Sequence, residues 1–256
     1  MRLLYLGNNW LGLKVLEHLR DRGEDDVAGL VIHPADQRKY VEEMLDVANL
    51  SDDCVFDGAT LGDADVRAQV RDLGCAIGVS VLFDYLLDPT FLGLFPDGVI
   101  NLHPSYLPYN RGQYPNVWSI IEGTPAGVTL HYVDAGIDTG DIIARHEVAV
   151  DAVDTGETLY RKLERAAVTL FRENWPAIRA GRIERTAQND EGASHRTRDV
   201  ETIDRIDLDR TYTGRELINL LRARTFPPHR GAYIEVDGQR VYLELSLSCD
   251  TKVGHG

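Results

Sequence analysis

Short apolar runs alternate with segments of helical spacing along the first part of the chain. Such continuous runs are typical of strands that are buried on both faces, and strands that alternate with helices form a parallel sheet. The pattern therefore predicts an α/β fold with a doubly wound, Rossmann-like, mostly parallel sheet. Strands are expected at residues 2–6, 27–32, 75–81 and 98–102 with a shorter one near Val55, and helices at residues 10–19, 37–48, 63–73 and 89–94.

The second part of the chain adds further strands and one long helix. Residues 127–134 alternate apolar and polar side chains as a half-buried strand does, and residues 142–150 form another strand. Residues 157–180 have the spacing of a long amphipathic helix, which Thr155 is expected to cap and Gly181 to end. Pro176 is expected to kink or split this helix, because proline removes a backbone donor and crowds the preceding turn.

A change of composition divides the chain near residue 185. Residues 185–206 are polar and show little periodicity, so we predict a larger domain at residues 1–185 and a small carboxyl-terminal subdomain at residues 186–256. The subdomain is expected to hold a linker, a helix capped by Thr213 and a β-hairpin, because Asp237-Gly238 separates strand-like runs at 232–236 and 240–247. Its small size predicts that it packs on the larger domain.

Composition places the chain among ordinary globular proteins. Of its 256 residues, 43% are hydrophobic and 27% are charged. The sequence holds no apolar run of about 18 residues, the length that a transmembrane helix needs. Its start, MRLLYLGNNW, lacks the layout of a signal peptide. These features predict a cytoplasmic protein with no membrane partner.

Charge and cysteine content bear on the partners and on the kinds of site that the chain is expected to have. Acidic residues outnumber basic residues by 41 to 27, and the net charge of −14 repels phosphate backbones, so no nucleic-acid partner is expected. We interpret the acidity as a source of solubility and leave open a salt-rich habitat. Cys54, Cys75 and Cys249 are far apart and odd in number, which predicts reduced, structural cysteines rather than disulfides or a zinc site.

Candidate chemistry gathers in residues 99–118, VINLHPSYLPYNRGQYPNVW. Because side chains alternate along a strand, Asn101 and His103 point to the same side, with Leu102 buried behind them. Pro104 and Pro108 keep the following loop out of a helix. The strand therefore presents two polar groups at its carboxyl end, where α/β sheets usually bind ligands.

Asp138 follows downstream between Gly136 and Gly140, which let the backbone bend sharply and direct one carboxylate inward. Together, an Asn, a His and an Asp suit the attack of an amine on a carbonyl. The amide donates to the developing oxyanion, the His acts as base or electrostatic stabiliser, and the Asp orients the imidazole. No serine or cysteine is placed as a nucleophile, and Ser105 is interpreted as a turn residue.

Each of these motifs also has another interpretation. Taken singly, a strand His and an Asp between glycines are usually structural. The turn GNNWLG at residues 7–12 lacks the G-x-G-x-x-G spacing and the Walker lysine, so it is interpreted as a tight turn and a nicotinamide oxidoreductase is not favoured. His103, His131 and His146 lack ligand spacing, so no metal is expected.

The motifs NLHPSYLPYNRG at residues 101–112 and GVTLHYVDAGIDTGDII at residues 127–143 closely resemble those of the formyltransferases that use 10-formyltetrahydrofolate. Two motifs in the right order and spacing are far more specific than either alone. The resemblance implies the formyltransferase fold, 10-formyltetrahydrofolate as formyl donor, and Asn101, His103 and Asp138 as catalytic residues. In that mechanism Asn101 and a protonated His103 stabilise the oxyanion, while Asp138 supports His103.

Within this family the chain resembles the sugar N-formyltransferases nearly end to end. Residues 104–132 and 212–238 look like the corresponding stretches of those enzymes, whose acceptors are nucleotide-linked 4-amino or 3-amino dideoxy sugars such as dTDP-4-amino-4,6-dideoxyglucose. Glycinamide ribonucleotide formyltransferases instead carry a serine-bearing glycine loop near the amino terminus. Methionyl-tRNA formyltransferases share Arg111-Gly112 but continue into a larger carboxyl-terminal barrel. Family members are often dimers, so a homodimer is expected.

The resemblance also implies two groups of binding residues. The folate contacts are expected beside residues 81–87 and in the downstream loop, at Leu82, Phe83, Asp84, Tyr85, Asp134 and Gly136. The nucleotide-sugar contacts are expected at Tyr109, Asn110, Arg111, Tyr114, Asn116 and Trp118, with Arg222, Arg224 and His229 toward the pyrophosphate. Structural alternatives stay open, since Leu82 completes the core equally well and the tail arginines fit a solvated helix face.

Two rival functions remain open at this point. One is a methionyl-tRNA formyltransferase-like enzyme that lacks the accessory domain, and the other is a noncatalytic folate-binding module. The nucleotide base, the amino position and epimer of the sugar, the oligomeric state and the biological pathway are not specified by the sequence.

Overall fold

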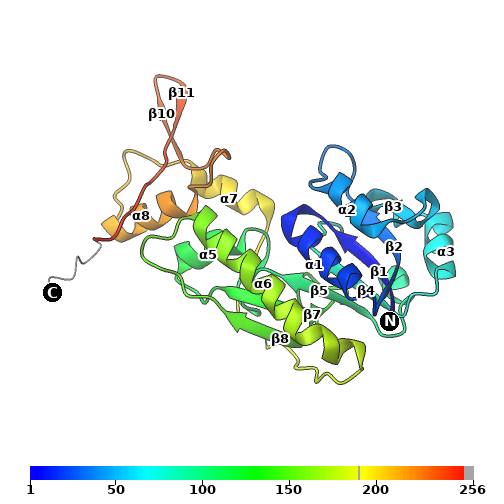
Figure 1. Cartoon of the computed structure of the whole chain (residues 1–256). Helices are drawn as coiled ribbons and strands as arrows, with labels where there is room; N and C mark the ends of the chain where they lie inside the picture. Colours follow the sequence, from blue (N-terminus) through cyan, green and yellow to red (C-terminus); the bar gives the residue numbers. More distant parts are fainter. Residues whose placement is uncertain (190, 251–256) are drawn as a thin grey trace.

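A seven-stranded sheet lies at the centre of the larger part of the chain (Figure 1). The computed structural model describes residues 1–189 and 191–250, and the strand order of this sheet is β3-β2-β1-β4-β5-β7-β8. Strands β1 to β5 run parallel, whereas β7 is antiparallel to both β5 and β8. The predicted α/β class with a mostly parallel sheet is confirmed. The strands are β1 (Arg2–Gly7), β2 (Asp26–Ile32), β3 (Val55–Asp57), β4 (Ile77–Val81), β5 (Val99–His103), β7 (Gly127–Tyr132) and β8 (Ile142–Glu147).

Helices cover both faces of this sheet, and each face has its own apolar cluster. Leu16 of α1 and Phe171 of α6 are fully buried in one cluster, while Phe91 of α4 lies in the other. The adjacent residues Leu3 and Leu4 of β1 belong to different clusters, because successive strand side chains point to opposite faces. The helices are α1 (Asn9–Asp21), α2 (Val41–Ala48), α3 (Ala64–Asp72), α4 (Pro89–Leu92), α5 (Pro115–Glu122) and α6 (Gly156–Arg179), with short 3-10 turns η1 (Asp52–Cys54) and η2 (Gly58–Thr60).

Two of these helices differ from the sequence prediction. Helix α2 begins at Val41 rather than at residue 37, because the preceding loop is pinned to the turn after β1: Asn8 Nδ2 donates to the Gln37 carbonyl, and the Lys39 N–H donates to Asn8 Oδ1. Helix α6 runs without interruption through Pro176. Proline removes a single backbone donor there, and Trp175, which is 1% exposed, is one of the residues that hold this last part of the helix against the core.

The predicted cap at the start of α6 and the predicted hairpin turn are both confirmed. Thr158 N donates to Thr155 Oγ1 and Thr155 N donates to Thr158 Oγ1, at 3.3 and 2.9 Å, which forms a capping box at the start of α6. Asp237 and Gly238 have left-handed φ values of 51° and 76°. Two consecutive positive φ values are what a two-residue hairpin turn requires.

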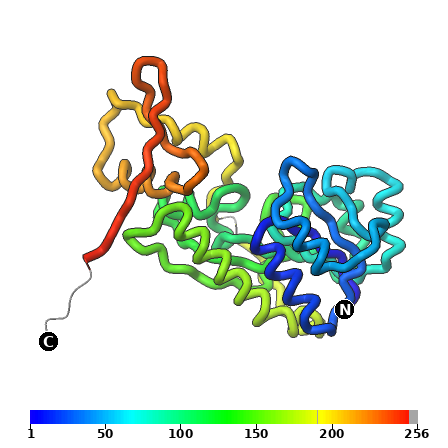
Figure 2. Tube along the Cα trace, turned by 45° about the horizontal axis from the view of Figure 1, so that its top comes forward, coloured from blue at the N-terminus to red at the C-terminus, as the bar shows by residue number. Residues whose placement is uncertain are grey.

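The carboxyl-terminal segment packs on the sheet domain mainly through one helix. Helix α8 lies against α5 and α6, and the β10-β11 hairpin projects away from the rest of the molecule (Figure 2). The short elements α5, β6, β9 and α7 have no counterpart among the elements that the sequence pattern predicts. The described chain holds no helix with the length and apolar character that crossing a membrane requires. The remaining elements are β6 (Arg111–Gly112), β9 (Ser194–His195), α7 (Thr197–Asp204), α8 (Gly214–Ala223), β10 (Tyr233–Val236) and β11 (Gln239–Tyr242).

Candidate active site

The carboxyl ends of the parallel strands open into a cleft of about 390 Å³. The order of the strands reverses between β1 and β4, and open α/β sheets bind ligands at such a point. The turn after β1, the loop after β4 and the end of β5 line the cleft, together with residues 112–116 and 133–138. The stretch that the sequence singled out therefore forms one part of a concave site.

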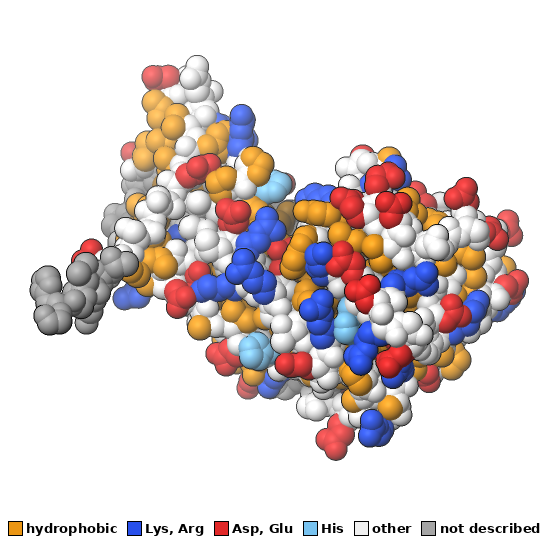
Figure 3. Space-filling view, in the orientation of Figure 1, with side chains coloured by type: hydrophobic (Ala, Val, Ile, Leu, Met, Phe, Trp, Pro, Cys, Tyr) orange, Lys and Arg blue, Asp and Glu red, His pale blue; other side chains and the backbone are white. Residues whose placement is uncertain are grey.

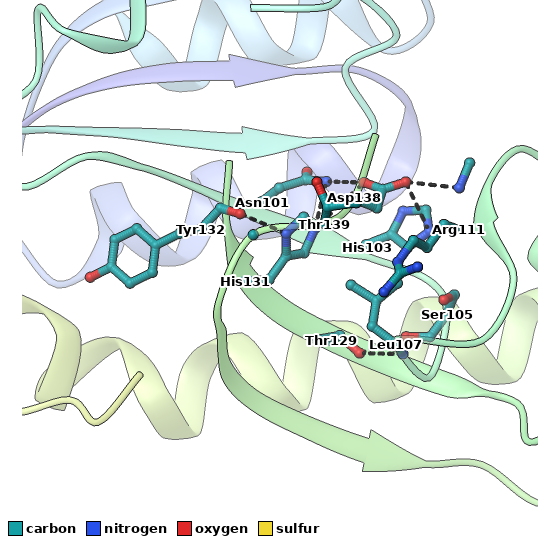
Figure 4. A network of polar contacts seen from close by, with 12 residues as sticks. Asn101, His103, Ser105, Leu107, Arg111, Thr129, His131, Tyr132, Asp138 and Thr139 are labelled. Carbon is teal, nitrogen blue, oxygen red and sulfur yellow. Dashed lines mark hydrogen bonds and ion pairs between the residues drawn. The ribbon is translucent and has the colours of Figure 1, made fainter. Parts of the chain in front are cut away.

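Asn101, His103 and Asp138 point toward one another at this cleft (Figure 4). Asn101 Nδ2 lies 3.4 Å from Asp138 Oδ1, and His103 Nε2 lies 3.5 Å from Asp138 Oδ2. Leu102 is 1% exposed and belongs to the core behind them, as the strand alternation predicts. The three side chains proposed as catalytic thus form a single polar cluster.

Backbone geometry fixes the position of the Asp138 carboxylate. Asp138 has a left-handed φ of 53°, and its Oδ2 accepts a hydrogen bond of 2.9 Å from the N–H of Gly112. The flanking glycines have no room for a side chain. A Cβ on Gly140 would lie 1.9 Å from the carbonyl oxygen of Tyr132, and one on Gly136 would lie 2.0 Å from the Thr139 hydroxyl. These glycines therefore allow the bend that directs Asp138 inward.

Replacing Gly140 with alanine is expected to lower the free energy of unfolding by about 1–3 kcal/mol, because the added methyl group pushes against a backbone carbonyl. Gly62 provides the matched control, since a Cβ there meets no atom within 4 Å. Chemical denaturation of the Gly140→Ala and Gly62→Ala variants measures the difference. Equal stabilities of the two variants would contradict this account of the loop.

His131 joins the cluster, although sequence analysis considered it only as a metal ligand. The antiparallel pairing of β5 with β7 places His131 opposite Asn101. His131 Nδ1 donates to the Tyr132 carbonyl at 2.8 Å, and Nε2 lies 3.3 Å from Asn101 Nδ2 and 3.5 Å from Asp138 Oδ1. His146 lies exposed on β8. Residues 1–189 and 191–250 contain no group of three or more His, Cys, Asp or Glu side chains that could hold a metal ion.

Burial and charge set the protonation states of the cluster. Burial lowers the pKa of His103, although the charge of Asp138 opposes this shift. Burial alone would raise the pKa of Asp138, but the charge of His103, the contacts with His131 and the N–H of Gly112 together hold this pKa well below its usual range. At neutral pH the cluster therefore combines an ionised carboxylate with a neutral His103 ring. The protonated His103 that the resemblance implies stays a prediction.

The wall formed by the loop after β4 contains every residue predicted to contact folate in that loop. Leu82 has a left-handed φ of 51°. The N–H of Asp84 donates to His33 Nε2 at 3.1 Å, and the His33 ring stacks on Phe83 with centroids 5.2 Å apart. Burial lowers the pKa of His33, which keeps the ring neutral and able to accept this bond. These contacts attach the loop after β4 to His33.

The opposite wall contains only part of the predicted sugar site. Tyr114 and Asn116 line the cleft. Four further residues do not line it, and other partners engage them: Asn110 donates to Ser119 and Thr124, Arg111 donates to Gln188, Trp118 stacks on His195, and the carbonyl of Tyr109 accepts from Ser105. Further residues that line the cleft were not predicted from the sequence, namely Asn8, Asn9, Lys39, Gln113 and Tyr160.

The two tail arginines lie outside the cleft lining, and their contact with a pyrophosphate stays a prediction. Arg222 Nη1 donates to the carbonyls of Asp151 and Asp154 at 3.0 and 3.1 Å. Arg224 Nη2 pairs with Asp204 at 3.0 Å. His229, the third residue of this group, packs on Phe226 with ring centroids 5.4 Å apart. Through these bonds the arginines connect α8 and its carboxyl-terminal end to neighbouring segments.

Comparison with known proteins matches two parts of the chain to described families. The profile of the family described as "Formyl transferase" matches residues 1–174, and that of the "N-formyltransferase dimerization C-terminal domain" matches residues 199–248. The dTDP-4-amino-4,6-dideoxyglucose formyltransferase of Mycobacterium bovis is 36% identical over 154 residues, which cover 59% of this chain and 66% of that protein. The match therefore spans just under two thirds of the length of that relative.

Solved structures resemble the chain over a longer span. A 4-N formyltransferase from Francisella tularensis is 27% identical with a TM-score of 0.83, and the match covers 97% of this chain and 98% of that chain. A formyltransferase from Anoxybacillus kamchatkensis, solved in complex with UDP-4,6-dideoxy-4-formamido-L-AltNAc and tetrahydrofolate, is 32% identical with a TM-score of 0.58 over 79% of this chain and 89% of that chain.

Proposed function

Because the chain belongs to the formyl transferase family, we propose that it transfers a formyl group from 10-formyltetrahydrofolate to the amine of a nucleotide-linked amino-deoxy sugar. The observation that carries this proposal is the convergence of Asn101, His103 and Asp138 at one cleft. Residues 82–87 and 133–138 form one wall of this cleft, and residues 112–116 form another part of its lining. The Anoxybacillus kamchatkensis relative, solved with a UDP-linked formamido sugar, supports the sugar branch over the tRNA enzymes. The named activity of the Mycobacterium bovis relative supports a dTDP-linked 4-amino sugar as the acceptor.

Neutral His103 is the base in the proposed reaction. As the acceptor amine forms a bond to the formyl carbon, its proton passes to His103 Nε2, which has no hydrogen-bond partner among the described residues. Asn101 Nδ2 donates to the oxygen on which negative charge develops. Asp138, 3.5 Å away, stabilises the imidazolium that forms. The bond from the formyl carbon to N10 then breaks and His103 returns the proton to N10, which leaves a formamide and tetrahydrofolate.

The wall of residues 82–87 and 133–138 fits the folate donor. This wall combines the apolar and aromatic side chains of Leu82, Phe83 and Tyr85 with the carboxylates of Asp84 and Asp134. A flat ring that carries N–H donors suits a surface of apolar contacts with a few acceptors. Gly136, held by its N–H to Asp134 Oδ1 at 2.9 Å, keeps the second loop close to the cleft. The donor supplies only the formyl group, and the proton transfers are made by the protein.

Incubation of the purified chain with 10-formyltetrahydrofolate and a panel of nucleotide-linked amino sugars tests the proposal. The panel holds dTDP-linked and UDP-linked sugars with the amine at position 3 or position 4. We expect tetrahydrofolate to form together with a sugar product that is heavier by one carbonyl group. Transfer to methionyl-tRNA but to no sugar would indicate the tRNA enzyme. Folate binding without transfer to any acceptor would indicate a noncatalytic module.

Two further properties are proposed for the whole chain. The cysteines are free, which fits a reducing compartment and supports the cytoplasm as the location of the chain.

The first family match ends at residue 174, and the second begins at residue 199. This gap supports a division into a catalytic domain at residues 1–185 and a smaller subdomain at residues 186–256. Limited proteolysis that cuts first near residue 185 would agree with this division.

We also propose that the chain forms a homodimer through the β10-β11 hairpin. Ile234 pairs with Val241, so Ile234, Val236 and Val241 share one face of the hairpin. Val236 and Val241 are 42% and 44% exposed, and apolar side chains gather on this projection in Figure 3. The family matched by this segment is described as a dimerization domain. An apolar face on a projecting hairpin fits a second copy of the chain.

Replacing Val241 with glutamate is expected to convert the dimer into monomers, because a charge would be buried at the centre of the interface. Light scattering after size-exclusion chromatography measures the mass. Leu208→Glu is the matched control, since Leu208 is also apolar and 65% exposed but lies outside the hairpin. A Val241→Glu variant that remains dimeric would show that the interface lies elsewhere.

A further inference from the structure

Gln188 forms a bridge between Arg111 and the loop that carries Asp138. Its side-chain oxygen accepts hydrogen bonds from Arg111 Nε and Nη2, at 3.1 and 2.9 Å. Its side-chain Nε2 donates to the carbonyl oxygens of Asp138 and Gly140, at 2.9 and 2.7 Å. The carboxamide therefore uses its acceptor on one segment and both of its donors on another.

The orientation of this carboxamide is fixed by chemistry. Arginine has only donors, so the side-chain oxygen of Gln188 must face Arg111 and its NH₂ group must face the two carbonyls. Arg111 is 8% exposed, and its Nη2 also donates to the carbonyl of Asn189 at 3.1 Å. A buried guanidinium with these partners is held in one place. Gln188 therefore links the side chain of Arg111 to the backbone of the loop at residues 138–140 by hydrogen bonds.

The bridge closes a ring of bonds around Asp138. Gly112, the residue after Arg111, donates its N–H to the Asp138 carboxylate at 2.9 Å, while Gln188 binds the Asp138 carbonyl. Arg111 and Gly112 therefore hold Asp138 at both ends, one of them through Gln188. Figure 4 shows Arg111 beside the group of Asp138 and His103. A left-handed non-glycine residue persists only when its surroundings determine its conformation, and this ring provides that restraint.

We propose that Gln188 is a positioning residue that sets the Asp138 carboxylate against His103, with Arg111 as its anchor. This proposal rests on the proposed formyl transfer, in which Asp138 stabilises the imidazolium of His103. It assigns Arg111 to the support of the catalytic loop, whereas the sequence comparison implied a contact with the sugar. Loss of the bridge would leave the other residues of the cleft in place but move the Asp138 carboxylate away from the His103 ring.

Gln188→Glu tests this role. The carboxylate keeps its pairing with Arg111 but sets an oxygen, in place of a donor, against two carbonyl oxygens. We expect kcat to fall by about 10–100-fold, because a catalytic group that is displaced from its productive position lowers the rate by this order. The KM values for folate and sugar should stay within about 3-fold of the wild type. Gln188→Leu, which removes all four bonds at similar size, should show the same split. A rise in KM for the sugar with unchanged kcat would overturn the proposal.

Asn189→Ala is the matched control on the same segment. Its backbone carbonyl still accepts from Arg111, and it loses only an exposed contact of 3.2 Å with Glu191. This variant should keep the wild-type kcat. If Asn189→Ala and Gln188→Glu lose activity equally, the segment has a general structural role and Gln188 has no specific one.

The pH profile separates positioning from structural damage. Asp138 and His131 are the titratable groups that face His103, and the charge of Asp138 raises the pKa of that ring. A displaced carboxylate lets the pKa of His103 fall, so the acid limb of the kcat profile should move to lower pH in Gln188→Leu, which adds no charge of its own. Partial loss of folded enzyme would lower kcat by the same factor at every pH and would not shift the acid limb along the pH axis.

Nuclear magnetic resonance of the histidine ring nitrogens tests the same point without turnover. In the absence of substrates, the titration of His103 should lie at lower pH in Gln188→Leu than in the wild type and Asn189→Ala. An unmoved titration in Gln188→Leu would overturn the positioning role even if the wild type transfers formyl groups. A moved titration in a chain without transferase activity would retain the positioning role and reject the proposed function.

Discussion

Replacing His103 with glutamine is expected to lower kcat by about 10²–10⁴-fold, which is the contribution typical of a general base. Glutamine keeps a polar group at the end of β5 but cannot accept the proton of the attacking amine. Burial lowers the pKa of His103, so the wild-type ring is neutral at neutral pH and the exchange neither removes nor buries a charge. The melting temperature should therefore change little. Initial rates of tetrahydrofolate formation measure the loss.

His146 supplies the control for this experiment. It is also a strand histidine, but it lies exposed on β8 and does not line the cleft. His146→Gln should keep the wild-type kcat. A His103→Gln variant within 3-fold of the wild type would reject His103 as the base, and a large loss of melting temperature would indicate a structural role instead.

The long elements of the fold could be predicted because their sequence signals are local. Leu3 and Leu4 lie on opposite faces of β1 and both are fully buried, which gives the continuous apolar run of a central parallel strand. The turn at Asp237-Gly238 has residues that tolerate a positive φ. Each signal depends only on neighbours in the chain, so no knowledge of the tertiary structure was needed.

The short elements could not be predicted because tertiary contacts create them. Strands β6 and β9 hold two residues each and pair across the molecule, Arg111 with Ser194 and Gly112 with His195. Periodicity cannot be detected in two residues. The start of α2 was misplaced for a related reason, because Asn8 holds the loop before this helix through its side chain.

The candidate site shows the same division between local and distant signals. Asn101 and His103 are two positions apart on one strand, so their common direction follows from the strand period. The place of His131 depends on the antiparallel register between β5 and β7, which the sequence alone does not specify. The partners of the arginines could not be predicted, because a guanidinium pairs with whichever acceptor the fold brings to it. Arg111 donates to Gln188, and Arg224 donates to Asp204.

Replacing Asp138 with asparagine is expected to lower kcat by about 10²–10³-fold, because the imidazolium of His103 loses the charge that stabilises it. Asparagine tolerates the left-handed φ of 53° at this position, so the loop should keep its course. Asp141→Asn is the matched control in the same loop, since no side-chain hydrogen bond or ion pair engages Asp141 in the described chain. The control should keep the wild-type rate.

The same exchange changes how stability depends on pH. The pKa of Asp138 is lowered in the folded chain, so the carboxylate contributes stability above the ordinary aspartate pKa of about 4 and loses this contribution as the pH falls below it. Asp138→Asn lacks the titrating group. The wild type should therefore be more stable than the variant at neutral pH, and the difference should shrink in acid. A difference that is constant between neutral and acidic pH would contradict the lowered pKa.

The pH profile of kcat decides which form of His103 works in the reaction. If the neutral ring is the base, the rate falls as the pH drops through the pKa of His103. Asp138 raises this pKa through its charge, so the acid limb should move to lower pH in Asp138→Asn even though the plateau is lower. If the protonated ring were the active form, the rate would instead fall as the pH rises, and the fall would begin at lower pH in the variant. The direction of the limb therefore distinguishes a base from an oxyanion stabiliser at His103.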